Sequence, residues 1–114
     1  MANRRVIIES PLAGEVEENL RYLRLAMRDS LLRFNEAPFA SHALYAQPGL
    51  LDDLVPEERR IGIEAGLLWG EVADASVVYT DRGISQGMKL GLLAAAKAGR
   101  PVEYRTVPGY ISKG

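Results

Sequence analysis

The 114-residue chain contains no cysteine and a single histidine, and these two shortages exclude several kinds of functional site. Without cysteine there is no disulfide, no thiolate catalysis and no cysteine-ligated zinc, which is compatible with a reducing cytoplasm, where we expect the protein to act. One histidine cannot build a multi-histidine metal site. We therefore expect neither a metal nor a cofactor.

The chain also lacks long apolar runs and an excess of charge of either sign. No apolar run approaches the ~20 residues that span a bilayer, and no signal-peptide core precedes the first predicted strand. Fourteen Lys and Arg residues against 15 Asp and Glu residues give a net charge of −1. This balance argues against a nucleic-acid polymer or an anionic membrane as partner. The length predicts one domain over residues 1–114, with a C-terminal tail at 105–114.

The stretch from Asp74 to Met88 is the most informative part of the sequence. A β-branched run at 76–80 is followed by a polar turn with glycine, and then by a helical pattern from about Ser85 to Ala98. A glycine turn before a helix N-terminus can bind phosphate, and ligands of open α/β sheets lie beyond the carboxyl ends of the strands. The same pattern also fits an ordinary structural junction that needs a turn glycine and a serine cap.

The remaining segments alternate between strands and helices. Arg5–Glu9 is a short apolar run that predicts a buried strand, and Val102–Arg105 predicts the last strand. Between 15 and 34 an amphipathic helix is predicted, with room for a Glu17–Arg21 ion pair. Its apolar face is predicted to contain Val16, Leu20, Leu23, Met27, Leu31 and Phe34. The order β-α-β-α-β-α-β predicts a parallel sheet of four or five strands, with Arg5–Glu9 and residues 76–80 adjacent at its centre.

The middle of the chain carries its histidine and a stripe of glycines. Asn35–Leu44 predicts a second short strand with His42 at its end, and 45–54 predicts a loop over the sheet. Pro56–Val72 predicts a helix whose core face contains Ile61, Ala65, Leu68 and Val72. Glycines at 62, 66 and 70 each cost ~1 kcal/mol in a helix, so another backbone must come close, within the fold or across subunits. We take the stripe to indicate a homo-oligomer.

Several short motifs follow one another in a recognisable order. They are Ser10-Pro11 after the first strand, Ala37-Pro38-Phe39-Ala40-Ser41-His42, Ala73-Asp74-Ala75, Gly83-Ile84-Ser85-Gln86-Gly87-Met88 and Gly99-Arg100-Pro101-Val102. Together, over about Val6–Arg105, they resemble the nucleoside 2-deoxyribosyltransferase-like superfamily, and more narrowly its small members encoded by phages and prophages. The resemblance implies a flavodoxin- or Rossmann-like three-layer α/β sandwich, usually oligomeric, with a site for nucleosides, nucleotides or related ribosyl compounds.

One position departs from the pattern of the enzymes that the chain resembles. In the transferases, a glutamate that attacks the anomeric carbon follows three residues after the Gly-Thr or Gly-Met step. Here Gly87-Met88 leads to Gly91, and a glycine cannot act as a nucleophile. The resemblance therefore favours binding over catalysis. Glu9 and Asp81 are the candidates for a displaced catalytic carboxylate.

The first hypothesis is that the chain binds a nucleotide-derived small molecule without changing it, for instance a cyclic-nucleotide or ADP-ribose-type immune signal that a phage gains from sequestering. The alternative is an N-glycosidase or deoxyribosyltransferase, and a third possibility is a structural oligomer with an empty pocket. Ser85, Arg82 and the backbone at 83–87 are expected to bind phosphate, Asp81 ribose, and Tyr45 or Tyr79 a base. The full set of expected ligand-binding residues is Ser10, Pro11, Gly14, His42, Tyr45, Tyr79, Asp81, Arg82, Gly83, Ser85, Gly87 and Met88.

Overall fold

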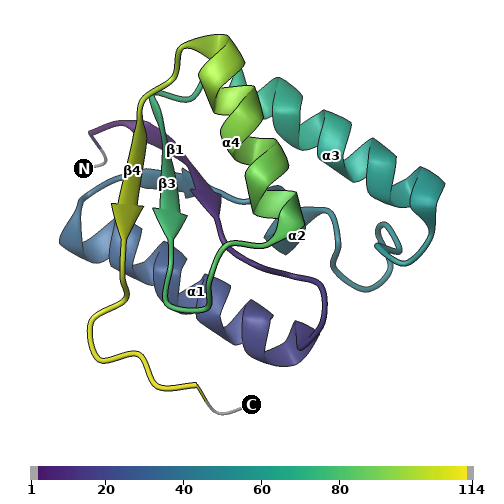
Figure 1. The fold of residues 1–114 in the computed structure, drawn as a ribbon, viewed down its shortest axis with the longest axis horizontal. Helices are drawn as coiled ribbons and strands as arrows, with labels where there is room; N and C mark the ends of the chain where they lie inside the picture. Colours follow the sequence, from purple (N-terminus) through teal and green to yellow (C-terminus); the bar gives the residue numbers. More distant parts are fainter. Residues whose placement is uncertain (1–2, 113–114) are drawn as a thin grey trace.

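The computed structural model describes residues 3–112 and contains one parallel sheet of four strands in the order β2-β1-β3-β4 (Figure 1). The strands are β1 (Arg5–Glu9), β2 (Ala37–Phe39), β3 (Ala75–Tyr79) and β4 (Val102–Arg105). β1 and β3 are parallel neighbours at the centre of the sheet, with Ile8 opposite Val77. The predicted pairing of the two central strands is confirmed.

Helices cover both faces of the sheet. α1 (Val16–Arg33) lies on one face, and α3 (Pro56–Gly70) and α4 (Gln86–Ala98) lie on the other, with the short α2 (Ser41–Leu44) between β2 and α3 (Figure 1). The result is the predicted three-layer, Rossmann-like α/β fold. No helix of the described residues 3–112 has the length and apolar character needed to cross a membrane.

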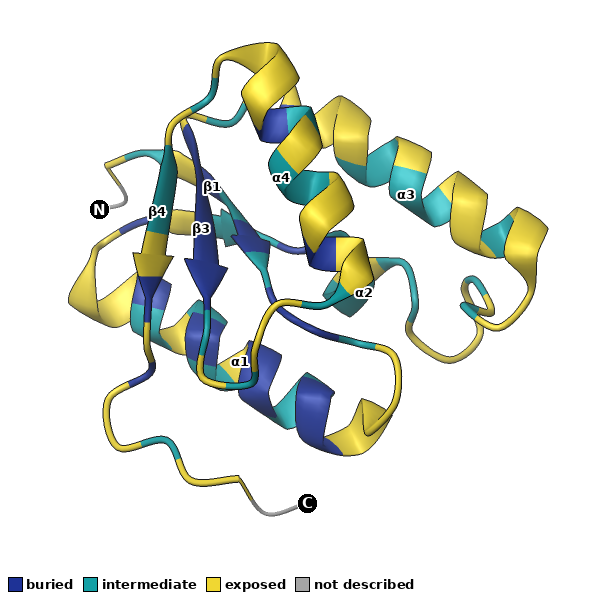
Figure 2. Cartoon of the chain, viewed as in Figure 1, coloured by how far each residue is buried: buried dark blue, intermediate teal, exposed yellow. Residues whose placement is uncertain are grey.

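The tightly packed core lies between the sheet and α1. Alternate strand residues such as Val6, Ile8, Val77 and Tyr79 point to this side and meet buried residues of α1. Figure 2 shows that α3 and α4 are mostly exposed or half-buried, whereas β3 is buried along its whole length. The α1 side therefore carries most of the packing, and the α3–α4 side is left open enough for a site.

The buried face of α1 differs from the predicted one. Val16 and Leu31 are exposed, while Asn19 and Ser30 are buried. The amide of Asn19 donates to the carbonyls of Leu12 and Ala13, and Ser30 donates to a carboxyl oxygen of Glu36 at 2.8 Å. Polar side chains with internal partners can be buried at little cost, so apolar periodicity alone placed the face incorrectly. The first-turn ion pair also differs, since Arg21 bonds Glu18.

The second predicted strand is wrong in its extent. β2 covers only Ala37–Phe39 and pairs only with β1, and the chain then turns into α2. Pro38 has no backbone N–H to donate, which suits a short strand at the edge of the sheet. His42 consequently lies on a helix and not at the end of a strand.

The predicted core face of α3 is also wrong, because Ile61 and Leu68 are exposed and the glycines face the rest of the fold. A Cβ on Gly66 would lie 2.7 Å from the Cβ of Ser41, and a Cβ on Gly62 would lie 3.4 Å from Leu51 Cδ1. The stripe thus lets α3 pack closely on α2 and its following loop within one chain. Self-association of the chain stays a prediction.

Candidate functional site

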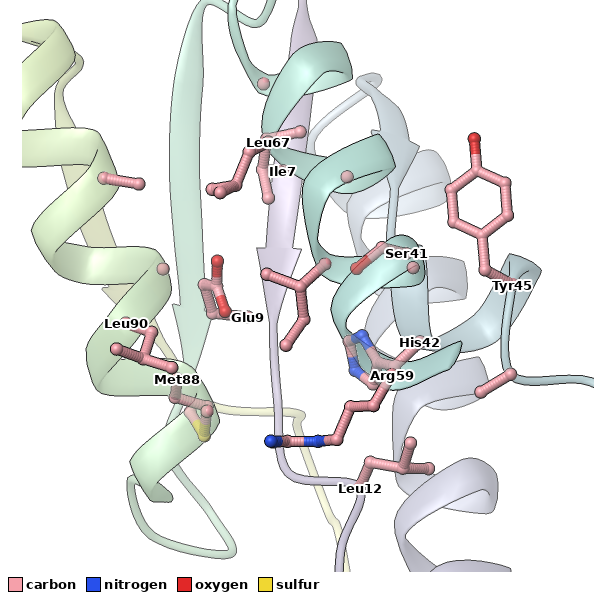
Figure 3. Close-up of a pocket in the computed structure, with 18 of the residues that line it drawn as sticks. Ile7, Glu9, Leu12, Ser41, His42, Tyr45, Arg59, Leu67, Met88 and Leu90 are labelled. Atoms are coloured by element: carbon pink, nitrogen blue, oxygen red, sulfur yellow. The ribbon is translucent and has the colours of Figure 1, made fainter. Parts of the chain in front are cut away.

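A cavity of about 680 Å³ lies between α3, α4 and the sheet, extending to the carboxyl end of β1 (Figure 3). Its volume falls within the roughly 300–1,000 Å³ that is usual for small-molecule sites. Ile7 and Glu9 form part of its floor because they point away from α1. The apolar residues that line it include Ile7, Ile8, Leu12, Phe39, Leu51, Ile63, Leu67, Met88, Leu90, Leu93 and Ala94.

Arg100 lines the end of the cavity that is farthest from the carboxyl ends of the strands. Its Nη1 donates to the carbonyl of Gly70 at 2.8 Å, and its Nε donates to Ser76 Oγ at 2.9 Å. A Cβ on Gly70 would lie 3.5 Å from the Arg100 guanidinium. Arg100 thereby ties the end of α3 to β3 at this end of the cavity.

The Glu9 carboxyl group lies against the backbone of α4 at Gly91. A Cβ on residue 91 would come within 2.5 Å of the Glu9 carboxyl carbon, so a larger residue would require the carboxyl to move. Figure 3 shows this carboxyl between β1 and α4. Gly91 is therefore the residue that gives the Glu9 carboxyl its room.

The Glu9 carboxyl is held in an unusual electrostatic environment. Burial raises its pKa from 4.5 to about 7, and the charge of Arg100 opposes this shift. Within residues 3–112 the structure contains no hydrogen bond to this side chain. Glu9 is therefore present as both acid and carboxylate near neutral pH, a state suited to proton donation, proton acceptance or nucleophilic attack.

Ser10, His42 and Arg59 form a polar group at the mouth of the cavity. Ser10 Oγ and His42 Nε2 are 2.9 Å apart, and burial lowers the pKa of His42 to about 4, so its imidazole is neutral at pH 7. The Arg59 side chain extends beneath His42 (Figure 3), with its Nε 3.8 Å from Asp53 Oδ2. A Cβ on Gly87, at the N-terminus of α4, would lie 3.7 Å from Arg59 Nη2.

The structure brings half of the expected ligand-binding residues to this cavity. Those that line it are Ser10, His42, Tyr45, Ser85, Gly87 and Met88, together with the catalytic candidate Glu9. Those that do not line it are Pro11, Gly14, Tyr79, Asp81, Arg82 and Gly83. Tyr79, Asp81 and Arg82 bond instead to α1 on the opposite face of the sheet.

Asp81 and Arg82 follow β3 but are engaged with α1 and the C-terminal segment. Asp81 Oδ2 accepts hydrogen bonds from Tyr22 Oη at 2.6 Å and from the backbone N–H of Val107 at 2.8 Å. Arg82 Nε donates to Asn19 Oδ1 at 2.7 Å. These contacts hold the segment after β4 against α1, so both residues have a structural role on the face opposite the cavity.

Ser85 and Tyr79, which were expected to bind ligand, also have structural roles. Ser85 is the N-cap of α4, where its Oγ accepts from the backbone N–H of Met88 at 3.3 Å. The structure therefore shows the serine cap that an ordinary structural junction requires. Tyr79 is fully buried and donates to Asp29 Oδ2 at 2.7 Å, so its ring is not available to stack on a base.

Sequence reasoning missed Arg59, Leu67 and Arg100, which also line the cavity. Arg59 and Leu67 lie on α3 beside the glycine stripe, at positions three or four residues from Gly62, Gly66 or Gly70. This spacing was the available signal, because a helix that faces the fold with its glycines presents the flanking residues to the same side. Among residues 3–112 no group of His, Asp or Glu is arranged to hold a metal ion.

Comparison with known proteins identifies the fold. The model of a protein family described as a domain of unknown function, DUF7768, matches residues 4–105. A solved structure of 2-deoxyribosyltransferase from Bacillus psychrosaccharolyticus is similar to this chain at 21% identity and a TM-score of 0.64, covering 94% of this chain and 75% of that one. No curated protein matches the sequence. The likeness confirms the predicted Rossmann-like α/β fold.

Proposed function

We propose that this chain, which belongs to the DUF7768 family, binds a nucleoside-like small molecule in the cavity between α3 and α4. The observation that carries the proposal is a cavity of about 680 Å³ in which Glu9, Ser10, His42 and Arg59 converge among apolar walls. The fold of the chain is similar to that of a 2-deoxyribosyltransferase. The cavity lies where open α/β sheets bind ligands.

The polar groups suit the parts of such a ligand. The Ser10–His42 pair can exchange hydrogen bonds with sugar hydroxyls, because hydroxyl and neutral imidazole both donate and accept. Arg59 at the mouth suits a phosphate of a nucleotide-derived ligand through charge-assisted hydrogen bonds. The role that we propose for this binding is sequestration of a nucleotide-derived signal by a phage-encoded protein.

Isothermal titration calorimetry with a panel of nucleosides and nucleotides tests the proposal. Arg59→Ala should weaken binding of a nucleotide severalfold, because it removes a cation that lines the cavity. The matched control is Arg60→Ala, since Arg60 follows in the same helix but pairs with Glu57 and Glu64 on the outer surface. A panel without any binder contradicts the proposal. Equal losses in the two variants would show that the site is elsewhere.

The Glu9 carboxyl favours a second candidate function, cleavage of an N-glycosidic bond. A carboxylate with a pKa of about 7 and no hydrogen bond within the described residues is free to attack an anomeric carbon. The bond from that carbon to the base would break with its electron pair passing to the base, and water would then release the sugar from Glu9. Chromatography of the incubated ligand separates the two functions. Free base that disappears with Glu9→Gln supports cleavage, and complete recovery of the ligand supports binding alone.

We also propose that the chain self-associates. Leu68, Trp69 and Val72 are exposed apolar side chains at the end of α3 and just beyond it, and clustered exposed apolar surface is typical of interfaces. Sedimentation equilibrium at micromolar concentration measures the subunit number. A clean monomer contradicts this proposal and leaves the binding proposal intact.

A further inference from the structure

The cavity has two chemically different halves, separated by the Glu9 carboxyl. On the side of the strand ends it is lined by Ser10, His42 and Arg59. On the other side of Glu9 the close-up shows Ile7 and Leu67, which both line the cavity (Figure 3). The residues that define this second half, which we call the apolar half, are Ile7, Leu67, Leu93 and Ala94.

The direction of the elements explains this division. β1 runs toward the strand ends, so Ile7 lies one side-chain repeat farther from the mouth than Glu9. α4 begins at the mouth with Gln86, so Leu93 and Ala94 lie two helical turns deeper. Arg100 lines the cavity beyond them, where it bonds to Gly70 and Ser76. The apolar half therefore lies between the Glu9 carboxyl and the Arg100 guanidinium.

The walls of the apolar half leave apolar area exposed to water. Leu67 from α3 is 46% exposed and Leu93 from α4 is 61% exposed, although both line the cavity. Removing such area from water is favourable in proportion to the area buried. A sugar matches the polar half through its hydroxyls, but it offers nothing that would fill the apolar half.

We propose that the apolar half is a subsite for an aromatic or aliphatic substituent, so that the ligand is an amphipathic nucleoside with its sugar at Ser10–His42 and an apolar group beyond Glu9. This inference rests on the proposed function and specifies the class of ligand. Lys97 and Arg100 also line the cavity, and neither favours an additional cation on the substituent.

Calorimetry with two probes tests the subsite: adenosine, and adenosine that carries a benzyl group on its exocyclic amine. The benzyl compound should bind wild-type protein at least about tenfold more tightly, which corresponds to about 1.4 kcal/mol. Leu67→Ser should remove most of that preference. Leu68→Ser is the matched control, because Leu68 is the next residue of α3, is 66% exposed and does not line the cavity.

Equal affinity of wild type for both nucleosides would overturn the subsite, and so would an equal loss of preference in the two variants. If neither nucleoside binds, the subsite is decided by titration with the apolar dye anilinonaphthalene sulfonate, and the panel of nucleosides and nucleotides separately decides the proposed function. Weaker dye binding in Leu67→Ser than in Leu68→Ser would support it, and equal binding would overturn it. Sedimentation provides the remaining control. A wild-type oligomer that Leu67→Ser dissociates would mean that a second copy covers these walls, which also overturns the subsite.

Discussion

Replacing Glu9 by Gln measures the cost of placing a carboxyl group in the cavity floor against Gly91. Burial raises the pKa of Glu9 from 4.5 to about 7. The unfolded chain ionises this group at the lower value, so folding between these pH values requires proton uptake. The contribution of Glu9 to stability is therefore fully present below about pH 4.5 and is lost as pH rises through about 7.

The size of this loss follows from the difference between the two pKa values. A tenfold change in an acid dissociation constant corresponds to about 1.4 kcal/mol, so ionised Glu9 destabilises the fold by about 3 kcal/mol at alkaline pH. Gln has nearly the same shape but does not ionise. The Glu9→Gln variant should match wild type at about pH 4 and exceed it by about 3 kcal/mol at about pH 8.

Urea unfolding followed by circular dichroism across this range measures the difference. The other titrating groups, such as buried His42 and the ion-paired Glu36, are present in both proteins, so their contributions cancel in the comparison. The control is Glu64→Gln, because Glu64 is exposed and pairs with Arg60 on the surface. A stability difference between Glu9→Gln and wild type that does not change with pH would refute the reasoning.

Two further predictions concern packing and protonation. Gly66→Ala should destabilise the fold by about 1–3 kcal/mol in thermal or urea unfolding, since its Cβ would lie 2.7 Å from that of Ser41, and a second substitution, Ser41→Gly, should restore the loss. Gly62→Ala, with its nearest contact at 3.4 Å, is the control that should be tolerated. The stability of His42→Gln relative to wild type should rise as pH falls from about 6.5 to about 4, because burial lowers the pKa of folded His42 and the unfolded wild-type chain takes up the proton first. A difference between His42→Gln and wild type that does not change over this range contradicts the second prediction.

The central strands could be predicted because their burial leaves a direct mark in the sequence. β3 is covered on both faces, so every residue from Ala75 to Tyr79 is buried and the run is continuously apolar or small. β1 pairs with it in the predicted parallel orientation. The order of strands and helices then limits the fold to a three-layer arrangement with few topologies.

The helix faces could not be predicted from apolar spacing, because other contacts determine which side is buried. Asn19 and Ser30 of α1 are buried since their side chains have hydrogen-bond partners inside the fold. Gly66 of α3 faces inward because Ser41 lies too close to leave room for a side chain at this position. Leu68 is therefore on the surface. Counting apolar residues detects neither of these causes.

The same limitation explains the division of the predicted site. Residues that end strands were expected to share one site, and Ser10 does line the cavity. Asp81 also follows a central strand, but its carboxylate accepts from Tyr22 of α1 on the other face. A position at the end of a strand thus predicts the edge of the sheet at which a residue lies, but it does not predict the face toward which its side chain points. Whether Arg59 and Leu67 reach the cavity depends on the rotation of α3 about its own axis. The packing of α3 on α2 sets that rotation.

The relation between Glu9 and Gly91 changes how the sequence bears on catalysis. A glycine at residue 91 indicates, taken alone, that a nucleophile is missing. In the structure that glycine provides the space in which the carboxyl of Glu9, from the neighbouring layer, packs on α4. Gly91 and the Glu9 carboxyl are therefore two parts of a single packing arrangement. The choice between the two proposed functions, binding and cleavage, consequently depends on the protonation and reach of Glu9 and is not decided by the residue type at position 91.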